Sequence, residues 1–246
     1  MPVWTNWTKS KVADEPRSTA RRASRFTDIA SPMMLVDDAG LWCEVSGAAC
    51  NGRAALFLDR DGVVVEDTHY LGTAERTRLI GGAAAAIGQC NRLNIPVVIV
   101  TNQSGIARGF YDWNGFHEVQ AALMAALETE GARIDAALAC AYHRDGQPPY
   151  RHDDHFWRKP NPGMIIEAGR RLDIALSHSF VVGDRADDIA SGRAAGLAGG
   201  VLVLTGQGKN QIEAARALAE PVFTVDVAAN LAAALALLTE SGRLGG

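Results

Sequence analysis

Short apolar segments alternate along the chain with longer, alanine-rich segments. The short segments, rich in β-forming residues, cover residues 54–58, 96–100, 136–142, 180–182, 201–204 and 222–225. The longer ones carry apolar residues at helical spacing and cover residues 82–93, 113–130, 163–172, 187–195, 211–219 and 228–238. Continuous apolar strands separated by helices are typical of a parallel sheet covered on both faces. The pattern therefore predicts an α/β fold with a doubly wound parallel sheet.

The first part of the chain lacks this alternation. Residues 1–25 mix Thr, Ser, Trp and Arg without an apolar period, and residues 17–25 are locally basic. We expect residues 1–52 to be an N-terminal extension that is partly disordered, residues 53–240 to form the α/β domain, and residues 241–246 to be a tail. A weakly phosphate-attracting arm and a true start at Met33 or Met34 are the alternatives for the extension.

Composition narrows the classes of partner. The net charge of −4 and the sequence pI of about 5.9 argue against a general nucleic-acid binder. Four widely spaced cysteines indicate a reducing compartment rather than a disulfide framework. We find neither an apolar run that could span a bilayer nor a secretory signal, so we expect a cytoplasmic protein without a membrane partner. The lack of a heptad pattern favours a monomer.

Polar residues follow the predicted strands. The first strand ends in Asp59-Arg-Asp61-Gly, the second in Thr101-Asn-Gln-Ser104-Gly, and the fourth in Gly-Asp184. The third runs into a polar loop that reaches Lys159. Because the carboxyl ends of parallel strands share one edge of a sheet, we expect these groups to converge there.

The residue types at these strand ends suit phosphate chemistry. Asp59 and Asp61 would lie on one side of an extended segment, and with Asp184 they offer the oxygen ligands that Mg²⁺ prefers. Asp188 would be either an acidic helix-start residue or an outer partner of the metal site. A glycine-permitted turn such as the one after Thr101 can present N–H groups to phosphoryl oxygens, and Lys159, stiffened by Pro160, can neutralise them.

These motifs, in this order, resemble the haloacid dehalogenase (HAD) superfamily. The match is closest to its branch of D-glycero-D-manno-heptose 1,7-bisphosphate phosphatases and histidinol-phosphatases. It covers about residues 54–238, and its most specific parts are residues 100–109 and 158–164.

The resemblance implies a Mg²⁺-dependent phosphatase that acts on a small phosphate ester. Asp59 would be the nucleophile that carries the phosphoryl group, and Asp61 the general acid and base. Mg²⁺ would be held by Asp59, the Asp61 carbonyl and Asp184. The expected phosphate- and substrate-binding residues are Arg60, Thr101, Asn102, Gln103, Ser104, Arg158, Lys159 and Arg185. Asp67, His69 and Tyr70 are expected at the edge of an open site, since the intervals between motifs leave no room for a large cap domain.

Two departures from the branch affect the expectations. Relatives typically carry Asn in the position of Val65 and often Lys in the position of Arg185. These differences affect the expected substrate specificity more than the expected catalytic chemistry. Many relatives also hold a structural zinc in a Cys-rich loop. Here the donors available are Cys140, His143, His152 and His155, and Trp157 cannot bind a metal. The donor count would allow zinc, but we expect a loop without it.

Several functions stay open at this point. The best match is a heptose 1,7-bisphosphate 7-phosphatase, with a histidinol-phosphatase or another sugar-phosphate phosphatase as the alternative. A phosphatase of nucleic-acid ends is disfavoured by the acidic pI. A non-catalytic phosphate-binding protein is disfavoured because all four motifs are intact.

Overall fold

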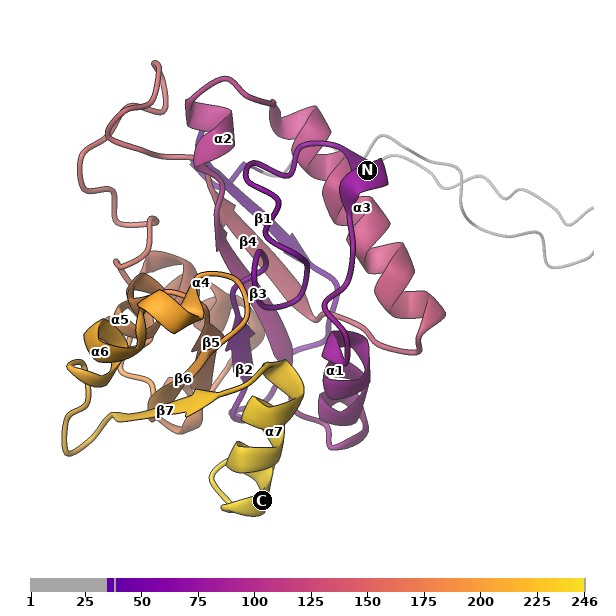
Figure 1. The fold of residues 1–246 in the computed structure, drawn as a ribbon, viewed down its shortest axis with the longest axis vertical. Coiled ribbons are helices and arrows are strands. Elements are labelled where there is room, and N and C mark those ends of the chain that lie inside the picture. The colour runs from indigo at the N-terminus through magenta and orange to yellow at the C-terminus, as the bar shows by residue number, and fades with distance from the viewer. Residues whose placement is uncertain (1–34, 38, 246) are drawn as a thin grey trace, which may run out of the picture. The chain divides into compact units, whose positions relative to one another are not determined.

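The described residues of the computed structural model contain one seven-stranded sheet, in the order β1-β4-β3-β2-β5-β6-β7 (Figure 1). The described residues are 35–37 and 39–245. The strands are β1 (Leu41–Val45), β2 (Leu56–Leu58), β3 (Val97–Asn102), β4 (Ala136–Cys140), β5 (Phe180–Gly183), β6 (Gly199–Val203) and β7 (Thr224–Ala228). Strand β1 is antiparallel to β4, and all other neighbouring strands are parallel. The predicted doubly wound α/β fold is confirmed.

Helices cover both faces of the sheet, as Figure 1 shows. They are α1 (Ala83–Arg92), α2 (Ser104–Ala107), α3 (Trp113–Thr129), α4 (Gly163–Leu172), α5 (Ala186–Ala194), α6 (Ile212–Arg216) and α7 (Leu231–Glu240). Side chains of α1, α3 and α7 form one apolar cluster with the sheet, and those of α4, α5 and α6 form the other. Asp112 and Asn230 cap α3 and α7 by accepting hydrogen bonds from backbone N–H groups of the first turn.

Strand β1 corrects the expected domain boundary. It lies inside residues 1–52, yet it pairs with β4 along its whole length, from Leu41 opposite Cys140 to Val45 opposite Ala136. Leu41 and Trp42 are buried. The sheet therefore begins before residue 53. At the other end, Leu244 is buried in the α1–α3–α7 cluster, although it belongs to the expected tail. Residues 1–25, to which the expectation of disorder mainly applied, lie outside the described residues.

The strand order places a switch point beside β2. After β2 the chain first builds β3 and β4 on one side and then β5, β6 and β7 on the other. Ligands in such sheets bind at the carboxyl ends of the strands, at the point where the order reverses. Asp59 follows β2 directly, and Asp184 follows β5, so both expected carboxylates lie beside this point. Within the described part of the chain, no helix is long and apolar enough to cross a membrane.

Candidate active site

Asp59 and Lys159 form a buried ion pair at the end of β2. The Lys159 Nζ lies 2.8 Å from Asp59 Oδ1 and 2.6 Å from Asp188 Oδ1, and it donates to the Val100 carbonyl at 2.8 Å. The Asp59 N–H donates to the Val182 carbonyl on β5, which fixes its backbone between two strands. A lysine that is 3 % exposed beside two carboxylates stays charged, and these carboxylates raise its pKa despite burial.

The side chain of Asn102 fixes the position of Lys159 by binding its backbone. Its side-chain Nδ2 donates to the Lys159 carbonyl at 3.0 Å, and its Oδ1 accepts from the Lys159 N–H at 3.1 Å. The amide thus binds the backbone of Lys159 as a neighbouring strand would. Asn102 was expected to bind phosphate, and in the structure its side chain holds the backbone of Lys159, the residue that faces the pocket.

Three buried carboxylates form a candidate cation site. Oxygens of Asp59, Asp184 and Asp188 all lie within 4.8 Å of one another. Burial is the largest cause that raises the pKa of Asp59 to about 7 and of Asp184 to about 6, and the neighbouring carboxylates add to it. Such a cluster is costly unless protons or a cation compensate its charge.

The two oxygens of Asp184 distinguish it within this cluster. Its Oδ2 accepts the Gln207 N–H at 2.7 Å, while its Oδ1 is buried and has no hydrogen-bond partner among the described residues. Buried carboxylate oxygens are almost always satisfied by a donor or a metal. The orphan oxygen, on a carboxylate that is clustered with those of Asp59 and Asp188, therefore fits a hard cation such as Mg²⁺.

Asp61 lies on the other side of Asp59 and is held by two donors. The Arg60 guanidinium contacts both carboxylate oxygens, with Nη2 2.9 Å from Oδ2, and the Gln103 Nε2 donates to Oδ2 at 2.9 Å. Arg60 itself is fully buried and lies over the Phe116 ring. Arg60 was expected to bind substrate, but no part of its side chain is accessible, and it contacts Asp61 instead.

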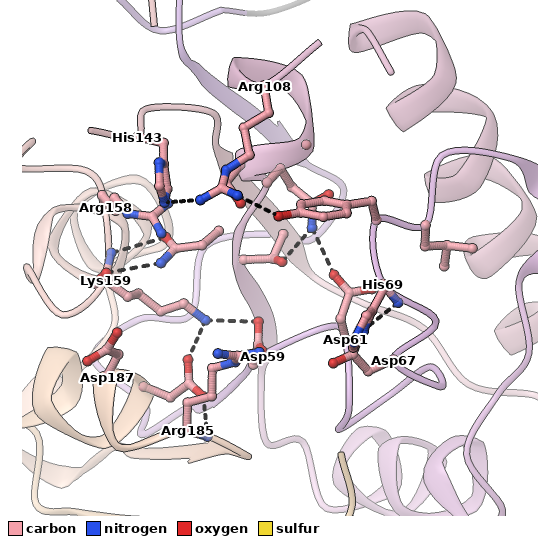
Figure 2. A pocket seen from close by; sticks show the side chains of 18 of the residues that line it. Asp59, Asp61, Asp67, His69, Arg108, His143, Arg158, Lys159, Arg185 and Asp187 are labelled. Atoms are coloured by element: carbon pink, nitrogen blue, oxygen red, sulfur yellow. Dashed lines mark hydrogen bonds and ion pairs between the residues drawn. The ribbon is translucent and has the colours of Figure 1, made fainter. Parts of the chain in front are cut away.

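One cavity of about 390 Å³ collects these groups (Figure 2). Asp59, Asp61, Thr101 and Lys159 line it, and Asp184, which is not among the lining residues, has a carboxylate oxygen within 4.8 Å of one from Asp59. Other residues expected at the site also line it: Asp67, His69, Tyr70, Asn102, Gln103, Ser104, Arg158, Arg185 and Asp188. The expected convergence of five side chains is thus present.

Arg108 forms a second cationic group at the mouth of the cavity, 3.0 Å from Tyr70 Oη through Nη1 and 3.2 Å from His143 Nε2 through Nη2. The other nitrogen of His143, Nδ1, faces the Asp145 N–H at 3.0 Å. Burial, Arg158 and Arg108 lower the pKa of His143, which favours the neutral ring. A neutral ring has one N–H group and one acceptor nitrogen. Because both ring nitrogens face donors, Arg108 and the Asp145 N–H, the ring N–H must point at one of these donors and makes no hydrogen bond there.

Comparisons with known proteins agree with this geometry. A HAD-hydrolase-like family model matches residues 156–234. The D-glycero-beta-D-manno-heptose-1,7-bisphosphate 7-phosphatase of Mesorhizobium japonicum is 46% identical over 170 residues, which are 67% of this chain and 76% of that protein. The enzyme of the same name from Rhodopseudomonas palustris is 41% identical over 152 residues, 62% of this chain and 84% of that one. The chain belongs to the HAD phosphatases, in the heptose-bisphosphate branch.

Solved structures extend the likeness of this HAD phosphatase to three dimensions. A HAD-like phosphatase from Mesorhizobium loti superposes with a TM-score of 0.68 at 39% identity, covering 77% of this chain and 99% of that one. The D,D-heptose 1,7-bisphosphate phosphatase of B. bronchiseptica, complexed with magnesium and phosphate, gives a TM-score of 0.67 at 31% identity, with coverage of 76% and 99%.

The four candidate zinc donors of this HAD phosphatase do not form one cluster. Cys140 is buried in β4, and burial raises the pKa of its thiol to about 12. The His155 ring stacks on Tyr142 at 3.6 Å, with His152 at its edge, while His143 contacts Arg108. Among the described residues, the Asp59–Asp184–Asp188 cluster alone brings three candidate ligands within 4.8 Å.

Sequence reasoning missed three parts of the site. Arg108 lies in the quoted motif of residues 100–109 but received no role. Tyr111, which donates to Gln103 Oε1, follows that motif directly. The turn of Thr205, Gly206 and Gln207 after β6 binds Asp184 and Gly62. This turn is a polar, glycine-rich segment after an apolar strand, so the strand-end rule used for the other motifs would have found it.

Proposed function

We propose that this phosphatase hydrolyses the 7-phosphate of D-glycero-D-manno-heptose 1,7-bisphosphate through an aspartyl-phosphate on Asp59, with Mg²⁺ as cofactor. The observation that carries the proposal is a cavity lined by cationic groups of different burial. Lys159 is buried beside Asp59, and Arg108 and Arg158, which are half-buried, line the same cavity. A substrate with two phosphates could place one phosphate beside Lys159 and the other beside Arg108 and Arg158.

The first half-reaction transfers the phosphoryl group to Asp59. An Asp59 oxygen forms a bond to phosphorus as the bond from phosphorus to the ester oxygen breaks, and Asp61 gives its proton to that oxygen. Lys159 and Thr101 would hold the non-bridging oxygens. Beside this covalent step, positioning and charge neutralisation supply most of the acceleration.

The second half-reaction releases the phosphate. Asp61, now a carboxylate, takes a proton from a water molecule as that water attacks phosphorus, and the bond to the Asp59 oxygen breaks. Asp61 is then protonated again and Asp59 is a free carboxylate. One residue therefore acts first as acid and then as base, as the reaction requires.

Asp59, the Asp61 backbone carbonyl and Asp184 would hold Mg²⁺, with Asp188 beside them. When bound, the ion neutralises charge on the carboxylates and on the phosphoryl oxygens. The orphan Oδ1 of Asp184 supports this assignment. The B. bronchiseptica relative, complexed with magnesium and phosphate, supports it as well.

Arg108 and Arg158 in the cavity lining also favour a bisphosphate over the alternative, histidinol phosphate. A phosphate oxygen between Arg108 and His143 would accept from both and remove the mismatch of donors there. Histidinol carries an ammonium group, which the Arg108 and Arg158 guanidinium groups would repel.

The experiment compares phosphate release from heptose 1,7-bisphosphate, heptose 7-phosphate and histidinol phosphate with purified protein and Mg²⁺. We expect kcat/KM to be highest for the bisphosphate, and turnover to be abolished in Asp59→Asn. Arg108→Leu should lower kcat/KM for the bisphosphate about 10- to 100-fold, the loss of one or two charge-assisted hydrogen bonds, but change it little for the 7-monophosphate.

The matched control is Arg216→Leu, which removes an exposed arginine on α6 away from the cavity and should change neither value. Equal loss on both heptose substrates in Arg108→Leu would contradict the role of Arg108. A preference of the wild type for histidinol phosphate would replace the proposed substrate.

A further inference from the structure

We propose that Gln103 is a positioning residue that holds the Asp61 carboxyl group for proton transfer to the leaving group. The inference rests on the role of Asp61 in the proposed function. Gln103 was expected among the phosphate- and substrate-binding residues, and the contacts of its side-chain amide indicate a further role.

The backbone of Gln103 is fixed first. Its N–H donates to the Cys140 carbonyl at 2.7 Å, at the end of β4, and α2 begins at the next residue. Gln103 is 2 % exposed. The side chain therefore starts from a rigid point between two strand ends and has little room for other rotamers.

Chemistry then determines how the Gln103 amide is oriented. Its Oε1 accepts from Arg60 Nη2 at 3.1 Å and from the Tyr111 hydroxyl. An arginine can only donate, so the amide oxygen must be the atom that faces Arg60. Nε2 is left facing Asp61 Oδ2 at 2.9 Å and Thr101 Oγ1 at 2.8 Å, and its two hydrogens are both used.

The Gln103 amide donates hydrogen bonds to two groups that face the pocket, the Asp61 carboxylate and the Thr101 hydroxyl. Asp61 receives a bond that fixes one oxygen, while its side chain remains 25% exposed toward the cavity. Thr101 accepts at its hydroxyl oxygen, so the hydroxyl hydrogen is free for a phosphoryl oxygen. Gln103 thus contacts both the proton donor and a hydroxyl that faces the phosphate, and the proposal concerns its effect on the proton donor.

Tyr111 supports Gln103 from behind, Arg60 contacts both Gln103 and Asp61, and packing holds both residues. A Cβ at Gly105 would overlap the Tyr111 ring, so the glycine of this motif makes room for it. Arg60 lies over Phe116, with its guanidinium carbon 5.4 Å from the ring centroid. These supports keep Gln103 from turning its amide.

The test uses leaving groups of different basicity. An alkyl phosphate needs a proton on its leaving oxygen, whereas p-nitrophenyl phosphate releases a stable phenolate and needs it far less. Gln103→Leu and Tyr111→Phe, in the full chain with Mg²⁺, should lower kcat for an alkyl phosphate. General acid catalysis contributes about 10²- to 10⁴-fold, so we expect a loss of about 10- to 100-fold in Gln103→Leu and a smaller one in Tyr111→Phe.

For p-nitrophenyl phosphate the same variants should lose less than about threefold, because that ester does not depend on the proton. The KM values should change little. Gln120→Leu is the matched control, since Gln120 is a buried glutamine of α3 that does not line the cavity. It should leave the ratio between the two esters unchanged.

Each other outcome overturns the inference. Equal losses on both esters would mean that Gln103 acts through Thr101 or through packing, and no loss on either would mean that it does not act. Should Gln103→Leu fail to fold, Tyr111→Phe decides by the same ratio. A wild-type protein without phosphatase activity would reject the proposed function itself, whereas an active wild type with unchanged ratios in the variants rejects the role of Gln103 alone.

Discussion

Asp184 and Asp188 lie four residues apart, yet their oxygens have different partners. Asp184 keeps Oδ1 without a hydrogen bond among the described residues. Asp188 uses Oδ1 for Lys159 and Oδ2 for the Arg185 N–H, which also caps α5. The sequence left two interpretations of Asp188 open, a helix-start residue and an outer partner of the metal site. The two oxygens of Asp188 are compatible with both roles at once.

This difference predicts unequal effects on metal binding. Asp184→Asn should weaken Mg²⁺ binding more than about 100-fold, because it replaces a charged ligand by a neutral amide. Asp188→Asn should weaken it by about 10-fold, the effect typical of an outer partner. Titration calorimetry with Mg²⁺ measures both. Equal losses would show that Asp188 is a ligand of the same rank.

The raised pKa of Asp59 predicts a pH-dependent stability without Mg²⁺. Between about 4 and 7 the folded state keeps a proton on Asp59 that the unfolded state loses, so this group stabilises most below its unfolded pKa and loses its effect as pH rises through about 7. The slope approaches about 1.4 kcal/mol per pH unit for one proton. The lowered pKa values of His143 and His155 act in the opposite direction.

A comparison with Asp59→Asn separates the carboxyl group from the histidines. Without Mg²⁺ the variant should be more stable than the wild type at pH 8, and the difference should shrink toward pH 5. Mg²⁺ should raise the Tm of the wild type more at pH 8 than at pH 5, because protons compete for the same oxygens. Urea unfolding and thermal melts provide the data. A constant difference between the two proteins across this range would contradict the raised pKa.

At the scale of elements, the strand ends could be predicted and the contacts between them could not. The alternation of apolar and alanine-rich segments located β2 to β7 to within a few residues, and the rule for parallel sheets placed Asp59, Thr101 and Asp184 at one edge. Asn102 hydrogen-bonds to the backbone of Lys159, and Arg60 hydrogen-bonds to the carboxylate of Asp61. Both contacts depend on side-chain geometry in the folded protein. Residue type alone does not encode those partners.

The turn after β6 predicts an effect of one added methyl group. Gly206 has φ +52°, and a Cβ there would overlap Asp184 Oδ2 and lie 2.9 Å from the Gly62 Cα. Gly206→Ala should therefore displace Asp184 and weaken Mg²⁺ binding at least about 10-fold, as loss of a supporting contact does.

Gly196→Ala is the control for this substitution. Gly196 also has a positive φ, +76°, but a Cβ there would meet nothing within 4 Å. It should lower the free energy of unfolding by about 1 kcal/mol through backbone strain and leave Mg²⁺ binding unchanged. If both variants lost metal affinity alike, strain rather than contact with Asp184 would be the cause.

At the scale of the whole molecule, the site depends on a sheet that is longer than the sequence pattern suggested. β1 was missed because it is five residues long, antiparallel, and precedes the regular alternation of strands and helices. Its apolar residues read as part of an irregular extension. Pairing with β4 is a long-range contact, which local patterns do not report.

The burial of β1 leads to a prediction about the domain boundary. Leu41, Trp42 and Cys43 are each at most 2 % exposed, and burying an apolar side chain contributes about 1.5–3 kcal/mol. Together they approach the net stability of a typical domain, about 5–15 kcal/mol.

We propose that the catalytic unit begins near residue 33. A chain starting at Met33 should fold and keep phosphatase activity, since all proposed site residues follow it. A chain starting at Arg53 should lose β1, expose β4, and either aggregate or unfold at a much lower temperature. Thermal melts and phosphate release from the two chains measure this, and equal stability of both would show that β1 is dispensable.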